Sequence, residues 1–142
     1  MTRPEIITLT DPSNGAEALI LAGCGFNCFR FRAEQEGHPI DVLWSEPDFE
    51  RGDKRASGSG IPLLFPFPGR LRGQTLTWNS RTYPLEGDDR RGNAIHGFVL
   101  TRPWRVIEQS STRVVGQFRA SFDDPRLLAC WPADFCITAT YE

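Results

Sequence analysis

The side chains best suited to bind a small polar ligand are one arginine and one histidine, each next to a stiff segment. Arg70 follows residues 60–69, which contain three prolines and two phenylalanines. His96 lies within residues 93–99, beside a glycine and a phenylalanine. Arginine presents a planar fork of donors, and histidine can donate, accept or carry a proton near neutral pH. Rigid backbone around both groups predicts a preformed site for a polar, hydroxyl-rich small molecule.

Both residues also have ordinary structural explanations. Arg70 could be an exposed arginine after a Pro–Gly turn, as most arginines are. However, the prolines of residues 60–69 exclude a central strand, so this segment is expected to be an ordered loop, where sites often lie. His96 could be a core histidine that is hydrogen-bonded to backbone. The second histidine, His38, is expected to lie in a turn without a functional role.

Other polar patterns are weaker. Residues 58–60 lack the lysine and the helix of a phosphate-binding loop. The pairs Asp88–Asp89 and Asp123–Asp124 lie in turn sequence, where aspartate is common for backbone reasons, so both are expected to be solvated. Tryptophan can stack on a sugar, but in strands it is more often a core residue. The tryptophans are Trp44, Trp78, Trp104 and Trp131.

The cysteines and acidic residues predict no metal site. Cys24, Cys28, Cys130 and Cys136 show no CxxC spacing, and neither close pair brackets a histidine. They are expected to be reduced thiols, partly in the core, with structural zinc or a disulfide as minor alternatives. No serine–histidine–aspartate arrangement or metal-ligand cluster is evident.

The composition describes one soluble globular domain of 142 residues, with 39% hydrophobic and 24% charged residues. The net charge of -2 and the scattered arginines argue against a nucleic-acid partner. No apolar run has the length of a membrane span, so no membrane partner is expected. The first residues lack the apolar core of a signal peptide, which predicts a cytoplasmic protein.

Alternation of apolar and polar residues with a period of two predicts an all-β, antiparallel β-sandwich. In residues 112–122 it places Val114, Phe118 and Phe122 on one face. A helical turn is expected at 125–130 and a long loop at 48–60. A strand that runs up to Glu142 would leave an unpaired edge, so a second chain or a second copy is expected to complete the sheet. The predicted strands are 28–32, 41–44, 74–78, 81–83, 104–107, 112–122 and 135–141, with 74–83 as a hairpin.

Two motifs together resemble the aldose 1-epimerase (galactose mutarotase) family. They are Gly60-x-Pro-x-x-Phe-Pro-Phe-x-x-Arg70 and Asn93-x-x-His96-Gly-Phe, followed by Pro103-Trp104. The 78–83 hairpin and Trp131-Pro-x-x-Phe135 follow the family's order and spacing, so the resemblance covers essentially the whole chain. It implies a large mutarotase-like β-sandwich and interconversion of the α and β anomers of a free aldose, without metal or cofactor.

The resemblance also implies roles for single residues. Arg70 looks like the family arginine that hydrogen-bonds sugar hydroxyls, and His96 like the first of two family histidines, which holds the sugar near its anomeric end. In the family the second histidine, a sugar-orienting aspartate and the glutamate base lie beyond the position of Tyr141. Residues 1–142 are therefore expected to be the N-terminal part of one such domain, with binding residues but no catalytic acid or base.

Two other functions remain open at this stage. One is a non-catalytic carbohydrate-binding module that uses Arg70 and His96 only to grip a sugar. The other is a structural β module whose apolar, proline-rich loop contacts a protein. A variant acting on hexose 6-phosphates would need further basic groups around the phosphate, and Arg72 is a candidate.

Overall fold

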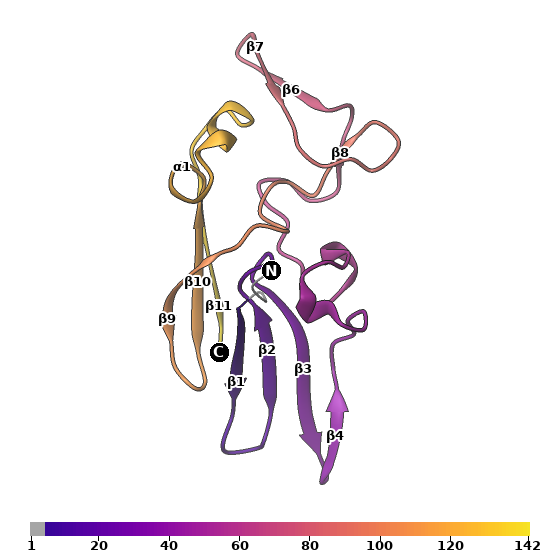
Figure 1. Cartoon of the computed structure of the whole chain (residues 1–142), viewed down its shortest axis with the longest axis vertical. Helices are drawn as coiled ribbons and strands as arrows, with labels where there is room; N and C mark the ends of the chain where they lie inside the picture. The colour runs from indigo at the N-terminus through magenta and orange to yellow at the C-terminus, as the bar shows by residue number, and fades with distance from the viewer. Residues whose placement is uncertain (1–4) are drawn as a thin grey trace.

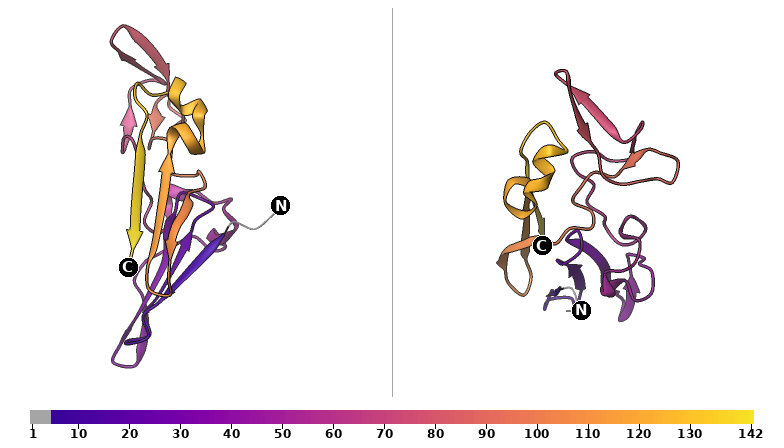
Figure 2. Two further views of the ribbon diagram at one scale, coloured as in Figure 1. Left: turned by 90° about the vertical axis from the view of Figure 1, so that its left-hand side faces the viewer. Right: turned by 45° about the horizontal axis from the view of Figure 1, so that its top comes forward.

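The computed structural model describes residues 5–142, and its regular structure is almost entirely antiparallel β-strand (Figure 1). A four-stranded sheet has the order β1-β2-β3-β4, and a three-stranded sheet has the order β11-β10-β9. Two short pairs, β5-β8 and β6-β7, lie at the other end of the molecule (Figures 1 and 2). The strands are β1 (Ile6–Thr10), β2 (Glu17–Leu21), β3 (Asn27–Gln35), β4 (His38–Asp41), β5 (Arg70–Leu71), β6 (Thr75–Trp78), β7 (Arg81–Pro84), β8 (Ala94–Ile95), β9 (Arg105–Gln109), β10 (Val114–Arg119) and β11 (Cys136–Tyr141). The predicted antiparallel all-β sandwich class is confirmed.

The long strands form because their apolar residues alternate or because both of their faces are covered. In β1, Ile7 and Leu9 are buried while the residues between them are exposed. In β3, adjacent Cys28 and Phe29 are both buried, since they point to opposite faces. Cys28 enters the main core, and Phe29 packs on Phe49 under a 3-10 helix (Phe49–Arg51) of the loop that follows.

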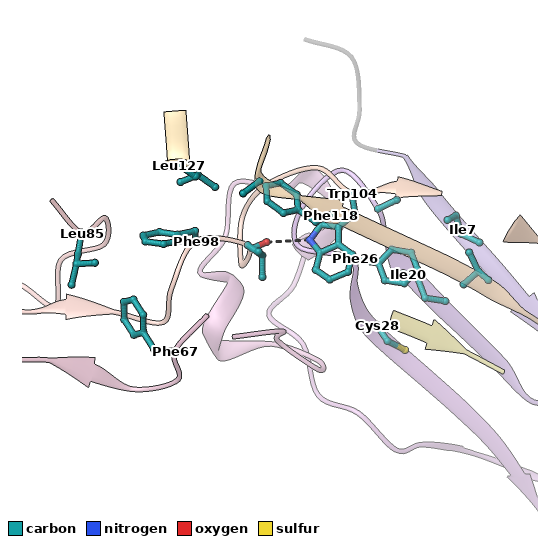
Figure 3. Close-up of a cluster of buried hydrophobic side chains, with 14 of the residues drawn as sticks. Ile7, Ile20, Phe26, Cys28, Phe67, Leu85, Phe98, Trp104, Phe118 and Leu127 are labelled. Atoms are coloured by element: carbon teal, nitrogen blue, oxygen red, sulfur yellow. Dashed lines mark hydrogen bonds between the residues drawn. The ribbon is translucent and has the colours of Figure 1, made fainter. Parts of the chain in front are cut away.

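Aromatic side chains join the two larger sheets in one core (Figure 3). Phe26 is fully buried and stacks on Trp104, with ring centroids 5.5 Å apart. The Tyr141 hydroxyl, at the end of β11, donates to the carbonyl oxygen of Phe26 at 3.2 Å. Trp104 Nε1 donates to the carbonyl oxygen of Val99 at 3.3 Å, the dashed line in Figure 3. The polar groups of these two buried aromatic side chains therefore donate hydrogen bonds to backbone carbonyl oxygens.

The strand expected at 112–122 is too long by two residues at its start and by three at its end. β10 ends at Arg119, and a helical turn, α1 (Ala120–Asp123), follows. The Asp123 carboxylate accepts a hydrogen bond from the Arg119 backbone N–H at 2.7 Å, which favours the turn over further strand. Phe122 therefore leaves the core face: it is 69% exposed and lies under the Arg105 guanidinium. The helical turn expected at 125–130 is confirmed as a 3-10 helix, Pro125–Ala129.

The prediction of a strand at 41–44 was also wrong. β4 instead ends at Asp41, and the turn before it is formed by Glu36 and Gly37, both with positive φ. His38, expected in a turn, pairs with Gln35 in the β3–β4 ladder. A proline at the second position of β4 is tolerated because β4 is an edge strand.

Local signals predicted the hairpin correctly. β6 and β7 are joined by Asn79 and Ser80, both with the left-handed φ that a two-residue turn of this kind needs. Trp78, next to the turn, and Trp44 are exposed, so the expectation that tryptophans are core residues was wrong for these two and right for Trp104.

The cysteines lie partly in the core, as expected. All four thiols are free, and Cys24 and Cys28 are buried. Burial raises the pKa of the Cys28 thiol to about 11, so it stays protonated. Within residues 5–142, no helix has the length and apolarity needed to cross a bilayer.

A glycine substitution tests the packing between β10 and the core. A Cβ on Gly116 would lie 2.6 Å from ring carbons of Phe26, whose ring is held by Trp104. We expect Gly116→Ala to lower the free energy of unfolding by about 1–3 kcal/mol, measured by urea denaturation. Gly58→Ala is the control, because its Cβ would meet nothing closer than 3.9 Å. Equal stability of the two variants would contradict this account of the core.

Candidate functional site

The proline-rich segment before Arg70 is fixed at its start by contact with β3. The Ile61 N–H donates to the carbonyl oxygen of Cys28 at 3.0 Å and to Asn27 Oδ1 at 3.1 Å. Asn27 is fully buried, and its Nδ2 donates to the carbonyl oxygen of Ser59 at 3.0 Å. A Cβ on Gly60 would lie 2.3 Å from the Cys28 oxygen, so only glycine allows this approach.

The histidine segment is fixed against the same loop by a second glycine. The Phe98 N–H donates to the carbonyl oxygen of Phe65 at 2.8 Å, and the His96 N–H donates to that of Gly69 at 2.9 Å. A Cβ on Gly97 would lie 2.2 Å from the Phe65 oxygen. His96 itself has a φ of 68°, a left-handed conformation that is unusual for a side-chain-bearing residue.

These contacts bring together the two site residues that the sequence predicted. β5 pairs with β8, and in this ladder Arg70 is the partner of Ile95, the residue before His96. The arginine side chain is 57% exposed. The segment before it is largely an ordered loop, as expected, with isolated bridges at Ile61 and Phe65 instead of a strand.

Asp89 is a site residue that sequence reasoning missed. Its side chain is only 1% exposed, and its Oδ2 accepts from Arg70 Nε at 2.8 Å. Hydrogen bonds from the Asn93 side chain, the Asn93 and Arg91 backbone N–H groups and the Arg70 guanidinium hold the pKa of Asp89 well below its ordinary value. The expectation that Asp88–Asp89 is solvated was therefore wrong for Asp89. The signal was present as an Asp-Arg-Arg-Gly-Asn turn, but the partner Arg70 is distant in sequence.

The His96 imidazole is neutral at neutral pH. Its pKa lies below 6.5, first because the ring is partly buried and then because the charges of Arg55 and Arg70 disfavour a further positive charge. Nδ1 is buried and has no hydrogen-bond partner within residues 5–142. The imidazole is thus not a core group bonded to backbone, and a neutral ring can donate from one nitrogen and accept at the other. Arg55 had no role in the sequence prediction.

Asp123 and Asp124 also form ion pairs with arginines instead of being solvated. They lie apart from Arg70 and His96. Asp124 accepts from Arg102 Nε at 3.0 Å and from Arg126 Nε at 2.8 Å, and Asp123 accepts from Arg105 Nε at 2.7 Å. Both aspartates line an open cleft of about 810 Å³ beside α1. Since these carboxylates are held by guanidinium groups, they fix the α1 turn.

The arrangement around Arg70 and His96 is therefore rich in hydrogen-bond donors. Arg70 offers charged donors, and His96 offers a neutral donor and acceptor. Asp89 accepts four N–H donors, which fills the lone pairs of its carboxylate. Within residues 5–142, no group of three or more histidine, cysteine, aspartate or glutamate residues is arranged to hold a metal ion.

The contact between Gly97 and Phe65 can be tested with a matched pair of glycines. Gly97 and Gly69 have nearly equal φ, 69° and 67°, but a Cβ on Gly69 would meet nothing within 4 Å. Gly69→Ala should cost about 1–2 kcal/mol for the left-handed backbone alone. Gly97→Ala should cost a further ~1–3 kcal/mol because the backbone must move. Thermal and urea unfolding of both variants measure the difference, and equal losses would mean that the close approach is unimportant.

The environment of His96 predicts a pH effect. Since the fold disfavours the protonated ring, the unfolded chain binds the proton more tightly, and the free energy of unfolding should fall as the pH drops below 6.5. NMR titration of the His96 Cε1–H signal measures the pKa directly, and His38→Gln leaves one histidine signal to follow. Arg55→Gln should raise the pKa of His96. A pKa at or above 6.5 in the unsubstituted chain would contradict this prediction.

Comparisons with known proteins identify the family and agree with the fold. The family model for aldose 1-epimerase matches residues 5–142. The GalM/aldose epimerase homologue from C. elegans has 21% identity and a TM-score of 0.73, covering 97% of this chain and 41% of that one. The Slr1438 protein from Synechocystis sp. PCC 6803 has 25% identity and a TM-score of 0.75, covering 99% and 44%. A galactose mutarotase-like protein from Clostridium acetobutylicum has 23% identity and a TM-score of 0.68, covering 98% and 45%.

The chain thus spans less than half the length of these solved structures. No curated protein matches its sequence. The family match covers the motifs at 60–70 and 93–98, the hairpin and all of the described strands. With the antiparallel sandwich fold shared by the solved structures, these findings show that the chain belongs to the aldose 1-epimerase family.

Proposed function

We propose that this chain supplies the Arg70–His96 part of a sugar site that serves the interconversion of α and β anomers of a free aldose. The observation that carries the proposal is the β5–β8 pairing, which brings two residues from separate motifs to one place. Arg70 would donate to sugar hydroxyls, and neutral His96 would hold the sugar near its anomeric end. Several ring hydroxyls can share such donors, which suits a hexose.

The reaction needs only a base and an acid. The base removes the proton of the anomeric hydroxyl, the bond between the anomeric carbon and the ring oxygen breaks, and the acid protonates that oxygen. The open aldehyde rotates, and the ring oxygen then attacks the other face of the carbonyl as the two protons return. Because a hemiacetal is already activated, neither a metal nor a cofactor is required.

We further propose that this chain alone binds the sugar without turning it over. The carboxylate nearest to Arg70 is that of Asp89, which is buried and saturated by donors, so it cannot take a proton from a ligand. The general acid and base would then come from a second chain or a second copy. β11 is an edge strand, and an apolar groove of about 580 Å³ opens between it and β2–β3, which supports completion of the fold at this edge.

The alternative is a non-catalytic carbohydrate-binding module built on the same two residues. The saturation of Asp89 favours it, since the site then offers donors but no proton acceptor other than His96. For either function we propose the cytoplasm as the compartment, and the four free thiols support a reducing environment.

Polarimetry and sugar titration together test these proposals. With fresh α-D-glucose or α-D-galactose, the 142-residue chain should not accelerate mutarotation above buffer, because losing an acid and a base costs about 10²–10⁴-fold each. NMR titration should nevertheless show saturable binding. Arg70→Ala and His96→Ala should each weaken it by about tenfold or more, since each removes hydrogen bonds to the ligand.

Arg119→Ala is the matched control, because this exposed arginine lies at the end of β10 and should leave binding unchanged. Acceleration that is lost in both site variants would show that acid and base lie within this chain or its oligomer, and the claim of incompleteness would fail. Absence of saturable binding to either sugar would reject both the epimerase and the carbohydrate-binding proposals, and would leave the structural β module.

A further inference from the structure

Arg70 is held by one edge of its guanidinium only. Its Nε donates to Asp89 Oδ2 at 2.8 Å, and neither Nη atom has a hydrogen-bond partner within the described residues 5–142. The two side chains differ sharply in exposure, 57% for Arg70 and 1% for Asp89. The charge-assisted bond thus joins a buried carboxylate to an arginine side chain that is more than half exposed.

Asp89 can hold the guanidinium in place because three further hydrogen bonds fix the Asp89 carboxylate itself. Its Oδ1 accepts from the backbone N–H groups of Arg91 and Asn93 at 2.8 and 3.0 Å, and its Oδ2 accepts from Asn93 Nδ2 at 3.0 Å. A carboxylate has about four acceptor positions, and all of them are used. The aspartate therefore cannot rotate toward a ligand without breaking several bonds.

Asn93 connects this arrangement to the strand that carries Arg70. Its Oδ1 accepts from the Gly73 N–H at 3.2 Å, and the Ala94 N–H donates to the carbonyl oxygen of Gly73 at 2.7 Å. One asparagine thus bonds both to Asp89 and to the backbone just after β5. Hydrogen bonds therefore link the Arg70 guanidinium, through Asp89 and Asn93, back to the backbone of its own strand, and they fix its position relative to that strand.

We propose that Asp89 is a positioning residue of the sugar site: it fixes the Nε edge of Arg70 so that both Nη atoms face the ligand. This inference rests on the proposed function, because it takes Arg70 as the sugar contact. Asp89 does not touch the sugar and takes no proton. Its contribution is to remove the conformational freedom of a long side chain before the ligand binds, which lowers the entropic cost of binding.

A purely structural role for Asp89 would be closure of the 88–93 turn, which also uses its carboxylate. The two roles differ in one measurable property, the hydrogen bond to Arg70 Nε. The NMR signal of that Nε–H group reports the bond directly, since a buried, bonded N–H exchanges with water more slowly than a solvated one. Arg70→Ala identifies the signal, and the exchange rate is then measured in the unsubstituted chain.

Asp89→Asn is the main variant, because the amide has the same shape as the carboxylate but replaces one acceptor oxygen with an NH₂ group. That NH₂ group cannot accept the N–H donors of Arg70 or Asn93. We expect it to abolish the slow Arg70 Nε–H signal and to weaken D-galactose or D-glucose binding by about 10–100-fold, the effect of a lost charged hydrogen bond. The double variant Arg70→Ala/Asp89→Asn should bind no more weakly than Arg70→Ala alone, since both act through one group. Asp88→Asn, the same charge change one residue earlier, should leave signal and affinity unchanged, because among residues 5–142 the Asp88 carboxylate accepts a hydrogen bond only from the Arg90 N–H, within the turn.

Three results would overturn the inference. One is a fast-exchanging Arg70 Nε–H signal in the unsubstituted chain, which tests the bond even if Asp89→Asn does not fold. Another is Asp89→Asn losing that signal while it binds sugar as tightly as the unsubstituted chain. The last is a further loss of affinity in the double variant. If the unsubstituted chain binds neither sugar, the proposed function fails and the ligand-facing part of the inference fails with it, while the exchange rate still decides whether Asp89 holds Arg70.

Discussion

The site depends on two places where backbone packs directly on backbone. At Gly60 the proline-rich segment lies against β3, and at Gly97 the histidine segment lies against Phe65, each at a distance that no Cβ allows. The atoms nearest to Gly97 are all backbone, and those nearest to Gly60 are the Cys28 and Phe29 backbone and Asn27 Oδ1, so a change of side-chain rotamer cannot relieve either backbone contact. The segment between them is held at both ends, and Arg70 and His96 inherit their positions from this constraint.

The same constraint explains why so much aromatic surface lies behind the site. Phe67 and Phe98 come from the two motifs and meet edge to face, with ring centroids 6.0 Å apart, and Trp131 packs on both of them. Backbone contacts alone contribute little apolar burial, and the rings supply it where the two segments cross. The residues of the two motifs therefore have two structural roles. The glycines allow the two backbone segments to lie in contact, and the aromatic side chains stabilise that contact by burying apolar surface.

Local signals in the sequence were enough for part of the fold and part of the site. The Asn79–Ser80 hairpin and the alternation of β11 are decided by neighbouring residues, and both were predicted. Phe122 was placed on the wrong side because Asp123 bonds to the Arg119 backbone, a contact that alternation does not reveal. Asp89 was taken as solvated because its partner Arg70 is 19 residues away. The family motifs pointed to Arg70 and His96 as site residues, and the structure places these two close together; Asp89, which bonds Arg70, lies outside the motifs.

The charges of the site limit what this chain can add to a proton-transfer reaction. Asp89 stays ionised because its donors keep its pKa low, and burial and nearby arginines lower the pKa of His96, so its ring is neutral at neutral pH. Asp89 therefore remains ionised and His96 remains mostly neutral between pH 7 and 8. A base and an acid for mutarotation must exchange protons in this range, and their pKa values must lie near it. On the proposed function, a change in turnover between pH 7 and 8 would therefore arise mainly from groups other than Asp89 and His96.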